Sequence, residues 1–151
     1  MFLKDWKISK LMITLYFDTK HAIIEHDKII DLSGGRHGIH DIGLLESVLA
    51  HVQNDNYYPT IKEKLSHLVY SVAMNHAFAD GNKRSSIALG AYFLEINGYG
   101  IIVGKFILEM ENVVLWVAQK KVDKQLLAQV VGDLIEYGEI TEEVKLKFVS
   151  I

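Results

Sequence analysis

Apolar residues recur every three or four positions along most of the chain, and this spacing predicts a series of amphipathic helices. The first predicted helix begins at the N-cap candidates Asp18 and Thr19 and ends at Gly34 and Gly35. Its apolar stripe consists of Ala22, Ile23, Ile29 and Ile30. This stripe, together with the caps, predicts the first helix of the chain.

Two more helices are predicted on either side of the polar segment "NDNYYP". Asp41 can cap the first of them, whose apolar positions follow a helical period: Leu44, Leu45, Val48, Leu49 and Val52. Thr60 and Glu63 form a T-x-x-E capping box at the start of the second, which extends to about His76. Its apolar face comprises Ile61, Leu65, Leu68, Val69, Val72 and Ala73.

The segment from Lys83 to Asn97 is apolar nearly all round, with Ile87, Leu89, Ala91, Phe93 and Leu94. This composition predicts a helix that is buried at the centre of the domain and ended by Gly98. Two further helical patterns follow, from Lys105 to Lys120 and from Asp123 to Tyr137.

Three short segments are less regular. "YGIIV" predicts a short extended piece, "KLMITLYF" near the N-terminus can form a short strand, and "ITEEVKLKFVSI" is ambiguous. With a single proline, Pro59, and no Gly/Ser-rich linker, the chain is predicted to form one all-α domain over residues 1–151. Its core falls in about 13–98 and its C-terminal helices in about 105–137.

The composition of the chain limits the binding partners and the chemistry that this domain can have. The formal charge of -3 gives no general electrostatic reason to coat nucleic acid or an anionic membrane. The absence of cysteine excludes disulfides, a thiolate nucleophile and Cys-ligated zinc. Charged residues interrupt the apolar N-terminal segment, and no run approaches the roughly 18 apolar residues of a membrane span. We therefore expect a soluble cytoplasmic protein without membrane or direct nucleic-acid binding.

Side chains capable of catalysis or ligand binding are most concentrated in "NHAFADGNKRSS", Asn75 to Ser86, between two predicted helices. A helix N-terminus offers unpaired N–H groups and a partial positive charge, which together bind anions. Lys83 and Arg84 place cations in that first turn, where the helix dipole disfavours them unless an anion is present. This local conflict is typical of a functional site.

Each side chain of the motif suits one part of phosphoryl or nucleotidyl transfer. Gly81 permits positive φ and close approach of a ligand, and Asn82 can hold the loop or donate to a phosphate. Asp80 supplies a hard oxygen ligand for Mg²⁺. His76 can take a proton near neutral pH, and Phe78 is interpreted as a core anchor.

A structural explanation of the same residues stays open at this point. "ADGN" is an ordinary turn sequence, His76 can finish a helix as a C-terminal cation, and Lys83 and Arg84 can be solvated. Residue types alone favour this structural explanation over a transfer site, because motif matches have a high false-positive rate.

The motif His76, Phe78, Asp80, Gly81, Asn82, Lys83, Arg84 resembles that of the Fic and death-on-curing (Doc) superfamily, which is H-x-F-x-(D/E)-(G/A)-N-x-x-R or a close variant; here a single residue, Lys83, separates the Asn from the Arg. The similarity extends from about Ile13 to Gly98 and includes the Doc-like segments "HDKIIDLSGG", "GIHDIGLLESVLA", "YYPTIKEKLSHLVYS" and "FLEINGY". The resemblance implies a helical bundle with the active-site loop between its two central helices. It also implies a toxin of a toxin-antitoxin pair.

Carried over by position, the resemblance gives His76 as the general base for a target hydroxyl and Asp80 as the Mg²⁺ ligand. It assigns the phosphate site of ATP to Gly81, Asn82, Lys83 and Arg84. Adenylylating Fic enzymes typically have Gly where this chain has Lys83, and a second Arg where it has Ile87. Lys83 instead resembles the Doc branch, in which the γ-phosphate is transferred. The favoured hypothesis is therefore a kinase of protein hydroxyls, with AMP transfer as the alternative.

The resemblance further implies a translation factor as target and an antitoxin partner that docks on a groove. No Ser or Thr is followed by Glu four residues later, so the self-inhibitory motif of some Fic proteins is missing and inhibition is expected in trans. A non-catalytic nucleotide- or peptide-binding module is the second alternative. A helix-turn-helix nucleic-acid binder is disfavoured by the acidic net charge.

Other candidates are assigned structural roles. His37, His40 and Asp41 have a spacing that suits a metal, but a solvated loop and a helix cap are favoured. The remaining sequence-level candidates are expected to lie at the surface or in packing positions: His21, His26, His51, His67, Tyr57, Tyr58 and Trp116.

Overall fold

Two central helices, α4 (Ile61–Asn75) and α5 (Asn82–Ile96), carry the motif loop between them. The computed structural model describes residues 13–151, and no strand occurs in this range. Helix α5 contacts α2, α4 and α6, while α4 contacts α3, α6 and α7 in addition to α5. The predicted all-α class and the buried central helix are therefore confirmed.

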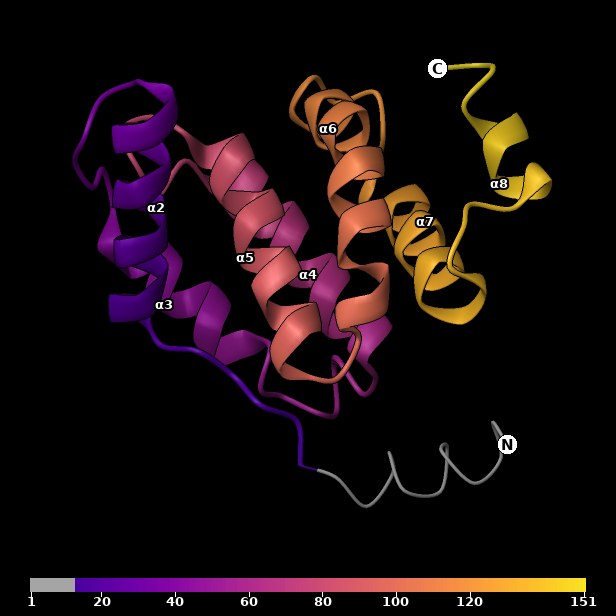
Figure 1. Ribbon diagram of the computed structural model, residues 1–151, viewed down its shortest axis with the longest axis horizontal. Coiled ribbons are helices and arrows are strands. Elements are labelled where there is room, and N and C mark those ends of the chain that lie inside the picture. The colour runs from indigo at the N-terminus through magenta and orange to yellow at the C-terminus, as the bar shows by residue number, and fades with distance from the viewer. Residues whose placement is uncertain (1–12) are drawn as a thin grey trace.

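Helices α2 (Thr19–Ser33) and α3 (Ile42–His51) cover one side of this central pair (Figure 1). Both begin where the sequence places their caps. The Asp18 carboxylate accepts a hydrogen bond from the His21 N–H at 2.8 Å, and the Asp41 carboxylate accepts one from the Gly43 N–H at 3.0 Å.

The other side is covered by α6 (Val103–Ala118), α7 (Lys124–Tyr137) and the short α8 (Glu142–Lys147) (Figure 1). The ambiguous C-terminal segment thus contains one short helix, with Thr141 as its N-cap. None of the helices in residues 13–151 combines the length and the apolar character that crossing a membrane requires.

The prediction of an extended piece at "YGIIV" is wrong. Residues Gly100–Ile102 form a 3₁₀ turn, η1, which leads directly into α6. The Tyr99 N–H donates to the Leu94 carbonyl at 2.9 Å, and the Ile102 N–H donates to the Tyr99 carbonyl at 3.1 Å. These hydrogen bonds coil the chain back onto the end of α5.

The possible N-terminal strand "KLMITLYF" is also absent in its described part, since residues 13–17 have no regular structure. Its first three residues lie outside the described range. The side chain of Asn97 accepts from the Leu15 N–H at 2.8 Å and donates to the Leu15 carbonyl at 3.0 Å, so this segment is tied to the end of α5.

Close packing fixes α5 in place. A Cβ on Gly90 would lie 2.8 Å from the Phe106 ring of α6 and 2.9 Å from a methyl of Val69 on α4. Glycine here lets three helices approach one another, and the same helix buries Leu89, Phe93 and Leu94. The N-terminus of α5 is therefore presented by a rigid element.

Candidate active site

Residues 76–81 form the loop that joins α4 to α5. Helix α4 ends at His76, which adopts the left-handed conformation with φ 53° and ψ 46°, and Gly81 does the same with φ 76° before α5. For a residue other than glycine this conformation costs about 1–2 kcal/mol. Backbone strain of this kind, when observed, supports a functional role for the position.

His76 lies exposed at the surface, and no hydrogen bond joins its ring to any residue in 13–151. Phe78, two residues later, is 1% exposed and belongs to the core. The predicted anchor role of Phe78 is therefore confirmed. The loop holds its aromatic side chain inside while it leaves the His76 imidazole open to a reactant.

Asn82 holds the loop rather than offering its side chain to a ligand. Its Oδ1 accepts from the Phe78 N–H at 3.0 Å, and its Nδ2 donates to the Phe78 carbonyl at 2.9 Å. Of the two roles that the sequence allowed for the Asn82 amide, the structure shows the first.

A second loop, residues 34–41, pairs with the motif through the main chain. The Ala79 N–H donates to the Gly38 carbonyl at 3.0 Å, and the His40 N–H donates to the Ala77 carbonyl at 2.8 Å. An isolated antiparallel bridge joins Ile39 to Phe78. Main-chain hydrogen bonds thus hold the motif against the loop between α2 and α3, and these bonds do not depend on the side chains of the motif.

Asp80 is held as a carboxylate. Its Oδ2 accepts from the Arg36 N–H at 3.0 Å, and its Oδ1 accepts from the Gly81 N–H at 2.8 Å. These two backbone hydrogen bonds, supported by the charges of Arg84 and Arg36, lower the pKa of Asp80. Each carboxylate oxygen keeps a further lone pair, so Asp80 can serve as the hard, anionic ligand that Mg²⁺ requires.

No local pattern in the sequence marks Arg36 as part of the site. Its side chain donates to the Ala79 carbonyl at 3.3 Å, in addition to the main-chain contact with Asp80. The only signal in the sequence was a cation in a glycine-rich loop, and nothing local connects that loop to a residue 44 positions later.

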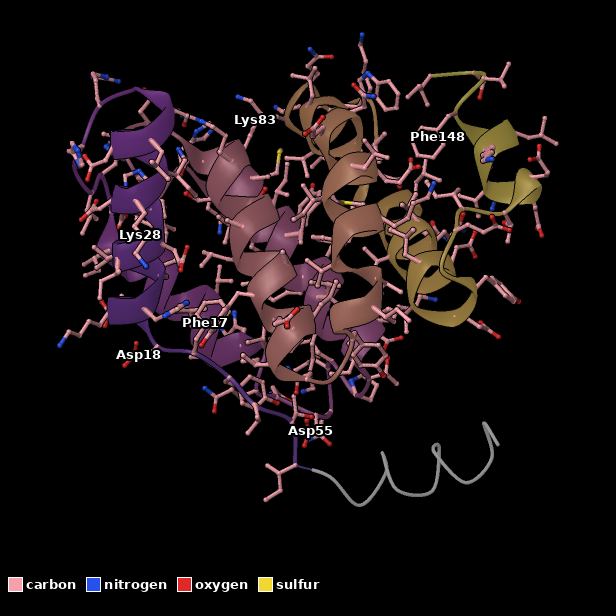
Figure 2. All side chains as sticks on the ribbon, viewed as in Figure 1. Phe17, Asp18, Lys28, Asp55, Lys83 and Phe148 are labelled. Carbon is pink, nitrogen blue, oxygen red and sulfur yellow. The ribbon has the colours of Figure 1, made fainter. Side chains whose placement is uncertain are left out.

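The first N–H groups of α5 lack an acceptor within the described residues. Gly81 has no side chain to cap it, and no residue in 13–151 accepts a hydrogen bond from the N–H groups of Asn82, Lys83 or Arg84. Lys83 projects from this end of the helix into solvent (Figure 2). Unpaired donors, the helix dipole and a free ammonium group coincide there, as an anion site requires.

Arg84 is engaged with the end of α2. Its Nη1 donates to the Ser33 hydroxyl and, at 2.8 Å, to the Gly34 carbonyl. A cation at a helix C-terminus is favourable. The guanidinium also has further N–H donors, and for these no partner occurs in the described part of the chain.

The weaker metal candidate is not assembled. His37 pairs with the carboxylates of Asp31 at 2.7 Å and Asp27 at 3.5 Å, and the hydrogen bond that it donates to Asp31 raises its pKa despite some desolvation. Asp41 caps α3. Residues 13–151 contain no group of three or more His, Asp or Glu side chains placed to hold a metal ion. The interpretation of a loop and a cap agrees with these contacts.

A sequence model of the Fic/DOC family matches residues 16–94, which include the whole motif. The chain belongs to the Fic/DOC family. It is 34% identical over 99 residues to "Toxin Doc" of Mycolicibacterium smegmatis (strain ATCC 700084 / mc(2)155), and this match covers 63% of the chain and 76% of that relative. The resemblance inferred from the motif is confirmed, and with it a protein-modifying transferase of the Fic/DOC type.

Proposed function

We propose that this Fic/DOC protein is a Mg²⁺-dependent kinase that transfers the γ-phosphate of ATP to a hydroxyl side chain of a target protein. The observation that carries the proposal is the placement of three features on one short loop. These are the exposed imidazole of His76, the ionised carboxylate of Asp80 and the uncapped N-terminus of α5.

His76 acts as the general base in this reaction. The target hydroxyl loses its proton to an imidazole nitrogen while its oxygen bonds to the γ-phosphorus, and the bond from that phosphorus to the bridging oxygen breaks to release ADP. An exposed His76 without a hydrogen-bonding partner in residues 13–151 is free to accept that proton.

The phosphates of ATP are bound by the start of α5. The N–H groups of Asn82, Lys83 and Arg84 and the Lys83 ammonium stabilise the negative charge there. Mg²⁺, held by Asp80, would neutralise phosphate charge when bound.

Two positions favour transfer of the γ-phosphate over AMP transfer. Lys83 is a bulky, exposed cation where a glycine would admit the α-phosphate. Ile87, where a second Arg would be needed, is partly buried and packs against the hydrophobic core. The phosphate site therefore has one arginine from the motif, Arg84, and its geometry is set by Lys83.

The relative named "Toxin Doc" supports a toxin role. We propose that the chain acts in the cytoplasm on a translation factor and is neutralised by an antitoxin. Expression alone and together with its antitoxin would test this role. Growth arrest that depends on His76 and is relieved by the antitoxin is expected, whereas harmless expression at high level would contradict it.

The chemistry is tested with purified protein, Mg²⁺, a bacterial lysate and ATP labelled at either the γ- or the α-phosphate. Protein labelled only from γ-labelled ATP is expected, and His76→Ala should abolish the label. Label from α-labelled ATP would establish AMP transfer instead. Nucleotide binding without transfer from either would favour the non-catalytic binding module.

A further inference from the structure

Helix α2 carries a buried histidine whose ring lies against the motif loop. His26 is 1% exposed, and its ring stacks on that of Phe78 with centroids 3.9 Å apart and 4° between the planes. Its Nε2 lies 2.7 Å from the carbonyl oxygen of Asp80, 54 positions later in the chain. His26 is thus a packing residue, as the sequence suggested, but it packs on the motif itself.

The partners of His26 define its orientation. A carbonyl oxygen can only accept, so Nε2 carries the proton and donates to Asp80. On the other side of the ring, the Asp27 carboxylate lies 3.2 Å from Nδ1. The ring is therefore fixed by the stack on Phe78 and the donor contact to Asp80.

We infer that His26 is a positioning residue that orients Asp80 toward Mg²⁺; this inference rests on the proposed function. His26 holds the carbonyl of Asp80, while the N–H groups of Arg36 and Gly81 hold its carboxylate. Because the residue is fixed at both its main chain and its side chain, the direction of the carboxylate is determined. Contacts that orient a metal ligand typically change metal affinity by about 10–100-fold.

Two substitutions separate the donor from the stack. His26→Phe keeps an aromatic ring on Phe78 but loses the N–H that Asp80 accepts. His26→Gln keeps an N–H donor of similar reach and loses the stack. The matched control is His21→Phe, because His21 lies on the same helix and stacks on Tyr92 of α5 with centroids 4.1 Å apart.

The experiment measures Mn²⁺ affinity by electron paramagnetic resonance in the presence of a non-hydrolysable ATP analogue, together with the Mg²⁺ concentration that gives half-maximal transfer. Circular dichroism confirms folding. We expect His26→Phe to lower the Mn²⁺ affinity about 10–100-fold and to raise the Mg²⁺ concentration for half-maximal transfer by a similar factor. His26→Gln should stay within about 3-fold of wild type, and His21→Phe should not change either quantity.

Unchanged Mn²⁺ affinity in His26→Phe, an equal change in His21→Phe, or a His26→Gln variant as weak as His26→Phe would overturn the inference. If His26→Phe does not fold, ¹⁵N spectra of the wild-type rings decide: a His26 proton on Nε2 that shifts on Mg²⁺–nucleotide binding is expected, and one found only on Nδ1 contradicts it. A wild-type protein that binds Mn²⁺ and nucleotide without transfer defeats the proposed function alone.

Discussion

Gly35 lies directly against the carboxylate of Asp80. A Cβ at this position would be 2.8 Å from Oδ2 of Asp80 and 3.1 Å from Nη2 of Arg84. Gly35 also has a φ of 119°, which side chains other than glycine rarely adopt. The absence of a side chain therefore lets the second loop close on Asp80, and the N–H of the next residue, Arg36, reaches Oδ2.

Gly35→Ala should both destabilise the protein and raise its Mg²⁺ requirement. Its neighbour offers the control, because Gly34 has a φ of 89° but nothing within 4 Å of its Cβ position. Gly34→Ala is expected to lose about 1–3 kcal/mol of unfolding free energy from the backbone alone. Urea denaturation and Mg²⁺ titration of both variants would show the added effect of the Asp80 contact; identical variants would mean that the contact is unimportant.

Lys83→Ala should weaken ATP binding without affecting stability. Lys83 is exposed, so the free energy of unfolding is expected to stay within about 0.5 kcal/mol. Losing a cation beside the phosphates should raise the KM for ATP about 10-fold, which is the effect expected for the loss of one charge-assisted hydrogen bond. Lys28→Ala on the outside of α2 is the control (Figure 2). Equal KM values for the two variants would place the phosphates elsewhere.

Lys64→Met should destabilise the protein and leave the specific activity of the folded fraction intact. Lys64 is 1% exposed, and its Nζ donates to the Val52 carbonyl at 2.8 Å and to Asp55 at 2.7 Å. Removing it leaves a buried carbonyl at the end of α3 unpaired, which costs about 1–3 kcal/mol. Asp55 lies at the opposite end of the molecule from Lys83 (Figure 2).

The exposed partner of Lys64 provides the comparison. The Asp55 side chain is 79% exposed, so Asp55→Asn is expected to lower the free energy of unfolding by no more than about 1 kcal/mol. Thermal unfolding of both variants measures the difference. An effect of Asp55→Asn as large as that of Lys64→Met would show that the ion pair, and not the buried hydrogen bond, is what stabilises this region.

His67 should make stability depend on pH below neutrality. Burial, with the neighbouring charge of Lys124, lowers the pKa of His67 to about 4, whereas an unfolded histidine titrates near 6.5. Between these values the unfolded chain binds a proton that the folded chain does not. Stability is therefore expected to fall as the pH drops from about 6.5 toward 4, by up to about 3 kcal/mol, with no contribution from this group above 6.5.

His67→Phe isolates that contribution. The His67 ring stacks on Tyr58 with centroids 4.2 Å apart, and phenylalanine preserves this contact while it removes the titrating group. Urea unfolding at pH 7, 6 and 5 is expected to give a shallower pH dependence in the variant. Parallel curves for the two proteins would assign the acid sensitivity to other groups.

The sequence predicted those features that depend on neighbouring residues. The caps at Asp18, Asp41 and Thr60 lie where local patterns placed them, because a helix start is a short-range hydrogen-bonding arrangement. The motif also predicted the family correctly. The prediction of an extended piece at "YGIIV" failed because Gly98, with a φ of 87°, and the end of α5 turn the chain. This turn outweighs the β-propensity of the isoleucines and valine.

Contacts between distant segments were not predictable in the same way. His26 and Arg36 precede Asp80 by 54 and 44 residues, and neither has a local pattern that marks it as part of the site. Lys64 falls within an otherwise regular helix, and its burial depends on where the end of α3 packs. A single sequence marks candidate functional residues more readily than the residues that hold them in place.

Because α2 lies at one side of the bundle, the site has a free energy of opening that differs from the free energy of unfolding of the whole domain. This helix contacts α3 and α5, and it and the loop after it supply His26, Gly34 and Arg36 to the motif (Figure 1). If α2 detaches, these partners leave while the packing of α4 with α5, α6 and α7 remains. Such subglobal opening requires less free energy than complete unfolding. Mild denaturant should therefore inactivate the protein before it melts the helical core.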